Sequence, residues 1–195
     1  MNWILGAIEE LLPVLIFFIT QAYFGFQMGL LAMTGTLVVL LIFTLRINQS
    51  VPRFAFISTV AFLLFAVPSV LTGNSSYFQL SDTVLDGLFA LLLLCSWFAR
   101  YPLLKVLFGS IFAITDRAWQ ILSLRWGLLF LCLAGFNEYI RVFYSDDMWS
   151  WYKLLSTIGI VLFGCYQFKL SMRERLPGES NKFGLRLSYK APERK

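Results

Sequence analysis

Residues 11–45 of the chain read LLPVLIFFITQAYFGFQMGLLAMTGTLVVLLIFTL and contain no charged side chain. As one α-helix this run would be about 52 Å long, whereas the hydrocarbon core of a bilayer is about 30 Å thick. An uninterrupted apolar run is typical of helices that cross a membrane. We predict either a pair of short spans that turn at Gly25, Gln27 or Gly29, or one span preceded by a re-entrant or interfacial helix.

The rest of the sequence repeats this pattern in shorter apolar runs. Hydrophobic residues make up 58% of the 195 residues, charged residues make up 14%, and the mean hydropathy is +0.73. A water-soluble domain cannot bury so large an apolar fraction. Four further spans are expected near residues 54–71, 83–98, 126–142 and 151–168. The predicted fold class is therefore all-α: a polytopic transmembrane helical bundle of five spans, or six if the first run is a hairpin.

The positions of the basic residues predict how this bundle is oriented, because Lys and Arg near span ends stay in the cytoplasm. All but two of the 16 basic residues fall on one side of the predicted membrane, and only Arg141 and Lys153 fall on the other. The side with most of the basic residues also holds the carboxyl terminus, which we therefore expect in the cytoplasm. The amino terminus lies outside with five spans and inside with six.

Two segments on the basic side differ from spans. Between Arg100 and Arg125 the chain is apolar but is interrupted by Lys105 and Gly109, which favours an interfacial helix in the cytoplasmic headgroup layer. After residue 170, charged and turn-forming residues dominate. The expected organisation is a transmembrane helical domain over residues 1–170 and a flexible basic cytoplasmic tail over residues 171–195.

The residue types limit the chemistry that the chain can carry out. The sequence has no histidine, the commonest general base and transition-metal ligand. Cys95, Cys132 and Cys165 lie far apart inside apolar runs, and we interpret them as small buried apolar residues. No nucleophile–base pair, phosphate-binding loop, metal-ligand cluster or nucleic-acid motif is present. We therefore expect no enzyme activity, no cofactor, no metal and no nucleic-acid partner.

Two further patterns have structural interpretations. Gly25 and Gly29 have the small-xxx-small spacing that permits close helix contact, and packing within the chain is favoured over a dimer face. The tryptophans near span ends are expected to anchor the helices at the membrane surfaces, with Trp97, Trp119 and Trp126 on the cytoplasmic side and Trp149 and Trp151 on the other.

Ionisable residues inside spans form the candidate site, since a charge at the bilayer centre costs roughly 2.5 to 3.5 kcal/mol. Glu138 and Arg141 are three residues apart and share a helix face, so they can pair. With neighbours expected at the same depth they make a candidate intramembrane polar cluster: Asp86, Asn137, Glu138, Arg141 and Lys153. We favour an interhelical network that fixes packing over a binding or ion-handling site.

A series of short motifs runs through most of the chain, roughly from residue 8 to residue 179. They are Glu10, Pro13, Phe17 and Phe18; Pro102, Leu103 and Gly109; Trp119; Arg125 and Trp126; Asn137, Glu138 and Tyr139; Trp149, Lys153 and Gly159; and Arg175, Pro177 and Glu179. In this order and at these spacings they resemble the intracellular septation protein A family of bacterial inner-membrane proteins, also called the YciB family. The sequence departs from the family at residues 19–22, where members often carry Tyr-Lys after the paired Phe.

The resemblance implies a role in cell envelope biogenesis and integrity and in septation, with no established catalytic activity. The favoured hypothesis is a non-enzymatic membrane protein that contacts other inner-membrane division or envelope proteins through its helices and its cytoplasmic face. The alternative is a small transporter or lipid-handling protein that uses the polar cluster around Glu138. The lipid bilayer is a partner under either hypothesis, and assembly with further copies of the chain is left open.

Overall fold

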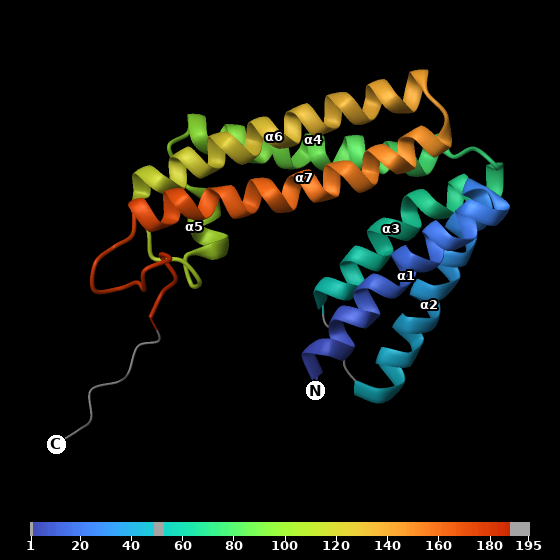
Figure 1. Cartoon of the computed structure of the whole chain (residues 1–195), viewed down its shortest axis with the longest axis horizontal. Coiled ribbons are helices and arrows are strands. Elements are labelled where there is room, and N and C mark those ends of the chain that lie inside the picture. The colour runs from blue at the N-terminus through green and yellow to red at the C-terminus, as the bar shows by residue number, and fades with distance from the viewer. Residues whose placement is uncertain (1, 49–52, 188–195) are drawn as a thin grey trace. The chain divides into compact units, whose positions relative to one another are not determined.

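The structure, a computed structural model, describes residues 2–48 and 53–187. Within these residues the chain is helical apart from turns, loops and three isolated β-bridges, which confirms the all-α fold class. The helices follow in this order (Figure 1): α1 (Asn2–Phe24), α2 (Phe26–Asn48), α3 (Arg53–Thr72), α4 (Ser76–Phe98), α5 (Leu103–Phe108), α6 (Asp116–Phe143) and α7 (Asp146–Arg173).

The apolar run of residues 11–45 folds as a helical hairpin. α1 and α2 are joined by Gly25 alone, whose φ of +84° is a left-handed conformation that glycine adopts without steric cost. The two helices lie side by side (Figure 1), and a Cβ on Gly29 would be 3.0 Å from both the Cβ of Gln21 and the carbonyl oxygen of Phe17. Of the two alternatives for this run, the hairpin is the one observed. Gly29 serves packing within the chain, whereas a Cβ on Gly25 would meet nothing within 4 Å, so that glycine supplies the turn.

The lengths of the helices suit membrane crossing. Among the described residues, four stretches are long and apolar enough to cross a bilayer by length and composition, namely Phe26–Phe43 in α2 and the helices α4, α6 and α7. Shorter apolar stretches, Leu12–Phe24 and Phe62–Thr72, lie within α1 and α3. α6 and α7 have 28 residues each, about 42 Å, so they extend past the predicted spans and are longer than the hydrocarbon core of a bilayer, which is about 30 Å thick.

The early start of α6 has a local cause. The Thr115 hydroxyl, just before the helix, accepts a hydrogen bond of 3.2 Å from the backbone N–H of Ala118 and so caps its first turn. Asp116 is the first residue of the helix, and its carboxylate pairs with the Lys105 ammonium of α5 at 2.6 Å. These two contacts fix where α6 begins relative to α5.

The chain forms two compact units, of which the first contains residues 1–82 and 137–150. Its core is a cluster of buried side chains: Phe17, Phe26, Leu30, Ala66 and Trp149. Trp149 is only 2% exposed, and its ring meets that of Phe26 edge to face at a centroid distance of 5.7 Å. The prediction that Trp149 anchors the bundle at a membrane surface is therefore wrong, because its ring packs inside the protein.

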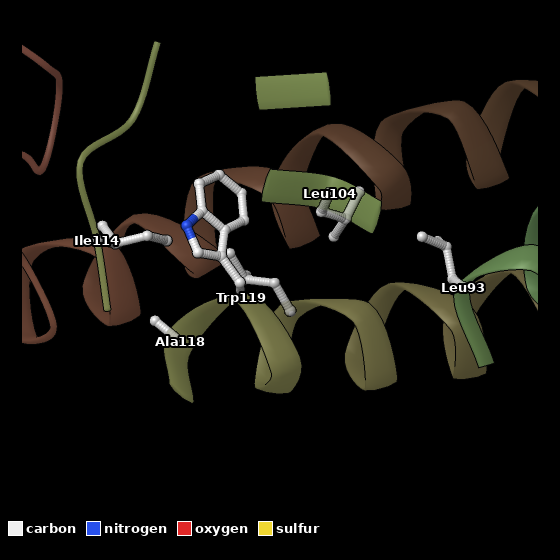
Figure 2. Packing of buried hydrophobic residues seen from close by; sticks show 6 residues of the cluster. Leu93, Leu104, Ile114, Ala118 and Trp119 are labelled. Atoms are coloured by element: carbon white, nitrogen blue, oxygen red, sulfur yellow. The ribbon is translucent and has the colours of Figure 1, made fainter. Parts of the chain in front are cut away.

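The second unit contains residues 83–136 and 151–195. Its core brings together buried residues of α4, α5 and α6 and of the segment before α6: Leu93, Leu104, Ile114, Ala118, Trp119 and Leu122. Figure 2 shows Leu104 of α5 and Ile114 close to the indole of Trp119. Trp119 is 3% exposed, so it is a core residue and not the surface anchor that the sequence suggested.

The segment predicted to hold an interfacial helix contains α5, which is short because the chain turns at Gly109, and its place in the headgroup layer stays a prediction. The segment after it, residues 110–115, is hydrogen-bonded to the C-terminal segment, which we define as residues 174–187. Backbone N–H groups of Ala113, Thr115 and Arg186 donate to the carbonyls of Gly184, Glu174 and Ile111 at 2.8 to 2.9 Å. These contacts were not predicted. The flexibility of a tail from residue 171 stays a prediction, and residues 188–195 lie outside the described residues.

Candidate functional site

Asn137 of α6 is the most enclosed residue of the predicted polar cluster, with none of its surface exposed. Its side-chain NH₂ donates to the carbonyl oxygen of Gln79 on α4 at 2.9 Å, and its side-chain oxygen accepts from the indole N–H of Trp149 on α7 at 2.8 Å. Both ends of the amide are thus bonded to other helices. A buried amide without partners costs free energy. The two hydrogen bonds therefore hold α4, α6 and α7 together at Asn137.

The side chain of Gln79 continues the connection towards the start of α7. Gln79 is 2% exposed, and its NH₂ group donates to a carboxylate oxygen of Asp146 at 2.8 Å. The same oxygen accepts a 2.6 Å hydrogen bond from the Ser75 hydroxyl, and Asp146 is the first residue of α7, where a negative charge is favourable. We call Ser75, Gln79, Asn137, Asp146 and Trp149 the buried amide network.

α1 is linked to the start of α7 by a separate polar contact. The side-chain NH₂ of Gln21 donates to the Ser150 hydroxyl at 2.8 Å and lies 3.4 Å from a carboxylate oxygen of Asp147. Gln21 falls within residues 19–22, where the sequence departs from the family pattern. The polar contacts of the first unit therefore bring four long helices together near Ser150 and Asn137, namely α1, α4, α6 and α7.

Glu138 and Arg141 form the ion pair that their spacing predicts. The Nε of Arg141 donates to one carboxylate oxygen of Glu138 at 2.9 Å, and an Nη donates to the other, so the pair is bidentate. The Arg141 side chain is 19% exposed and that of Glu138 is 40% exposed. The two charged residues inside the span predicted over residues 126–142, Glu138 and Arg141, are therefore paired with each other on one helix.

Asp86 and Lys153 are placed differently from the other three cluster residues. Both are half-buried, on α4 and α7, and belong to the second unit, whereas Asn137, Glu138 and Arg141 belong to the first. The gathering of all five into one cluster stays a prediction. Gln79 and Asp146 were not predicted as site residues, because both lie outside the predicted spans. The signal that could have found Gln79 is that it is the only amide side chain of its helix, just before the predicted span of residues 83–98.

The second unit contains an apolar cavity of about 430 Å³. Its walls come from α4, α5, α6 and α7 and are almost entirely aliphatic and aromatic, with Leu93, Leu104, Trp119, Trp126, Phe130 and Phe168 among them. Gln167 and Ser171 of α7 are the polar exceptions apart from the indoles, and each is 5% exposed. Arg125 of α6 donates to the Gln167 side-chain oxygen at 3.0 Å. Arg125 immediately precedes the span predicted over residues 126–142.

A hollow of about 710 Å³ lies beside this cavity, lined by the end of α4 and the beginnings of α5 and α6. Its charged lining residues are Arg100, Lys105, Arg117 and Asp116, which carry a net charge of +2. We call it the basic hollow. Arg100 has a φ of +53°, an uncommon conformation for a residue other than glycine, at the turn that leads from α4 to α5.

Among the described residues, no group of three or more His, Cys, Asp or Glu side chains is arranged to hold a metal ion. Cys95, Cys132 and Cys165 are free thiols on the surfaces of α4, α6 and α7, so the expectation that they are buried is wrong. Each lies on an apolar helix of a predicted span, where an exposed cysteine behaves as a small apolar residue towards lipid.

Comparison with known proteins gives a consistent set of relatives. The family model described as "Intracellular septation protein A" matches residues 5–176. An "Inner membrane-spanning protein YciB" of Rickettsia massiliae is 30% identical over 89% of this chain and 97% of its own length. Proteins of the same name from Nitrobacter hamburgensis and Bradyrhizobium are 26% and 27% identical, over 86% and 84% of this chain and 84% and 82% of their own lengths. No solved structure matches the chain.

Proposed function

The chain belongs to the intracellular septation protein A family, and from this premise we propose that it is a non-enzymatic inner-membrane protein that supports cell envelope biogenesis, envelope integrity and septation. The family is one of inner-membrane proteins and not a known family of enzymes. Septation comes from the family's description, and the contacts with other proteins are our own extension of it.

The polar side chains of the first unit support a structural role, because they are bonded to one another. Asn137, with no exposed surface, has both amide ends bonded to Gln79 and Trp149, and Glu138 is paired with Arg141. Polar groups that are fully bonded to one another fix helix packing and leave little capacity to bind a ligand. We therefore propose that the protein acts through the surfaces of its helices.

Those surfaces are largely apolar. On α7, Leu155, Val161 and Leu162 are 59 to 64% exposed, and comparable side chains lie on the other long helices. Lipid acyl chains and the apolar faces of other membrane helices are the partners that such surfaces accept. We propose that other inner-membrane division or envelope proteins dock on these faces.

The orientation that we propose follows from the basic residues and the six long helices. With six crossings both termini lie in the cytoplasm, together with Arg46, Arg100 and the C-terminal segment. The loops at Gly25, at residues 73–75 and at residues 144–145 then face the periplasm.

Deletion of the gene in its own bacterium tests the proposal. We expect increased uptake of a membrane-impermeant dye, greater sensitivity to hypo-osmotic shock and longer cells with misplaced septa, all restored by the wild-type gene. A deletion strain with an intact envelope and normal septa under hypo-osmotic stress would contradict it.

The alternative function, a small transporter or lipid-handling protein, depends on the Glu138–Arg141 ion pair. A charge pair inside a span is a feature that transport sites and packing networks share. Replacement of Glu138 distinguishes a transport site from a packing network. At a transport site the variant loses function at normal protein abundance, whereas in a packing network its abundance falls.

A further inference from the structure

The same three helices, α4, α5 and α6, line both the apolar cavity and the basic hollow. α4 contributes Phe89, Leu92 and Leu93 to the cavity, and Trp97 and Phe98, which lie further along the helix, to the hollow. α6 contributes Asp116, Arg117 and Gln120 to the hollow, and Trp119, Leu122, Trp126 and Phe130 to the cavity. A molecule with one charged end and one apolar end would therefore meet matching surroundings at both ends.

α5 lines both spaces and is bonded to its neighbours α4 and α6. Leu103, Leu104, Leu107 and Phe108 face the cavity, while Lys105 and the preceding Pro102 face the hollow. The Lys105–Asp116 ion pair joins α5 to α6, and the backbone N–H of Leu103 donates to the Ser96 hydroxyl of α4 at 3.0 Å. The site is therefore built from fixed elements and not from a loop.

From this arrangement we propose that the second unit holds one anionic phospholipid, with its phosphate in the basic hollow and one acyl chain in the apolar cavity. The net charge of +2 around Arg100, Lys105 and Arg117 complements a phosphate. The cavity's aliphatic and aromatic walls complement an acyl chain, and its volume of about 430 Å³ is within the range of small-molecule sites.

The chemistry of the walls selects this occupant over others. A soluble anion would fill the hollow but leave the cavity empty, and a neutral lipid would fill the cavity but gain nothing from the cations. The basic hollow lies on the side of the chain that the Lys and Arg pattern places in the cytoplasm, so the lipid comes from the cytoplasmic leaflet. The proposal goes beyond the proposed function and does not depend on it.

Native mass spectrometry of the full-length protein tests the proposal. The detergent-purified protein is titrated with dioleoyl phosphatidylglycerol or with dioleoyl phosphatidylcholine, and retained lipid is counted. We expect one phosphatidylglycerol per chain to survive at activation energies that remove phosphatidylcholine. Equal retention of the two lipids, or loss of both, would overturn the proposal.

Filling the cavity locates the acyl chain. Gly164 lines the cavity, and a Cβ there would lie 3.8 Å from the Trp126 ring, an ordinary contact, so Gly164→Leu is the variant chosen to fill the cavity. Gly159→Leu on the same helix is the matched control, because a Cβ there meets nothing within 4 Å. Gly164→Leu should weaken phosphatidylglycerol binding about tenfold or more, and Gly159→Leu should leave it unchanged.

Removing one cation locates the phosphate. Arg117→Gln, in the basic hollow, should weaken binding about fivefold, whereas Arg173→Gln, on an exposed basic residue at the end of α7, should have no effect. Gel filtration and thermal melting of each variant confirm that it is folded. Folded Gly164→Leu and Arg117→Gln proteins that bind as tightly as their controls would refute this site.

Discussion

Asn137 shows what a single polar side chain contributes within an apolar bundle. Its amide bonds to the carbonyl of Gln79, 58 residues earlier, and to the indole of Trp149, 12 residues later. Hydrogen bonds between membrane helices contribute about 0.6 kcal/mol on average and up to about 1.7 kcal/mol. Leaving a buried partner without its bond adds a further penalty, so a residue of this kind affects stability through its neighbours as well as itself.

A double-mutant cycle measures this contribution. Asn137→Ala should lower the free energy of unfolding by about 1 to 3 kcal/mol, because the Gln79 carbonyl and the Trp149 indole both lose a partner. Trp149→Phe keeps a smaller aromatic ring against Phe26 and Phe78 and removes the N–H donor. Unfolding in mixed micelles should give a coupling energy of about 0.6 to 1.7 kcal/mol between the two changes. Purely additive effects would contradict the bond.

Single residues also show which contacts a sequence can predict. The Glu138–Arg141 pair was predicted because both residues lie on one helix, where spacing alone decides which side chains meet. The bonds of Asn137 were not, because they depend on how three helices are packed against one another. For the same reason Trp149 and Trp119 were taken for surface anchors, since their positions near span ends say nothing about which way each ring turns.

At the scale of helices, glycine decides the course of the first 48 residues. Gly25 supplies the left-handed turn between α1 and α2, and Gly29 lets the two helices approach each other closely. The sequence located this turn to within a few residues but left two alternatives open, because the run is too long for one span and short for two. The positive φ at Gly25 and the contact at Gly29 come only from the structure.

Gly29→Leu tests the hairpin. A side chain at this position would collide with the Gln21 side chain and the Phe17 backbone, and such overpacking costs about 1 to 3 kcal/mol. Gly35→Leu on the same helix is the control, because a Cβ there meets nothing within 4 Å. We expect reduced membrane abundance and a lower melting temperature for the first variant alone. Equal behaviour of the two variants would argue against the close packing of α1 and α2.

The contacts between the C-terminal segment and residues 110–115 could not be predicted from the sequence. Charged and turn-forming residues such as Arg175, Pro177 and Gly178 are typical of a solvated tail. The backbone hydrogen bonds that hold this segment carry no signature in the side chains, and the pairing of Ile114 with Arg175 joins residues far apart in sequence.

Gly184→Ala should loosen this segment. Gly184 has a φ of +79°, and a Cβ there would lie 2.8 Å from the Ser171 carbonyl oxygen. Gly178→Ala is the control, since Gly178 has a similar φ of +90° but a Cβ there meets nothing within 4 Å. Both variants carry the backbone strain, about 1 to 2 kcal/mol, and only the first adds a collision. Hydrogen exchange at the Ala113 and Arg186 amides should accelerate in Gly184→Ala well beyond the control, and comparable rates would count against the packing.

At the scale of the whole chain, the topology that we propose depends on the distribution of Lys and Arg and on the number of long helices. Six helices of at least 20 residues are present among the described residues, and the fourteen basic residues of the predicted cytoplasmic side fall at ends that alternate consistently. The proposed topology places both termini and the connection between α2 and α3 in the cytoplasm.

Reporter fusions test this topology. Fusions after Lys195, near Arg53 and at the amino terminus should be active with a cytoplasmic reporter such as green fluorescent protein. A fusion near Asn74 should be active with a periplasmic reporter such as alkaline phosphatase. A periplasmic carboxyl terminus would reverse the whole topology, and a periplasmic amino terminus would mean that α1 and α2 do not both cross.

The most direct test of a structural role for the polar residues is complementation of the deletion strain with Glu138→Gln, scored for membrane abundance, dye uptake and septum placement together. Glu179→Gln, which removes an exposed pair with Arg186, is the control and should behave as wild type. We predict that Glu138→Gln lowers abundance because Arg141 loses its partner, and that envelope and septation defects follow the abundance. Normal abundance with no rescue would contradict this and identify Glu138 as part of a working site.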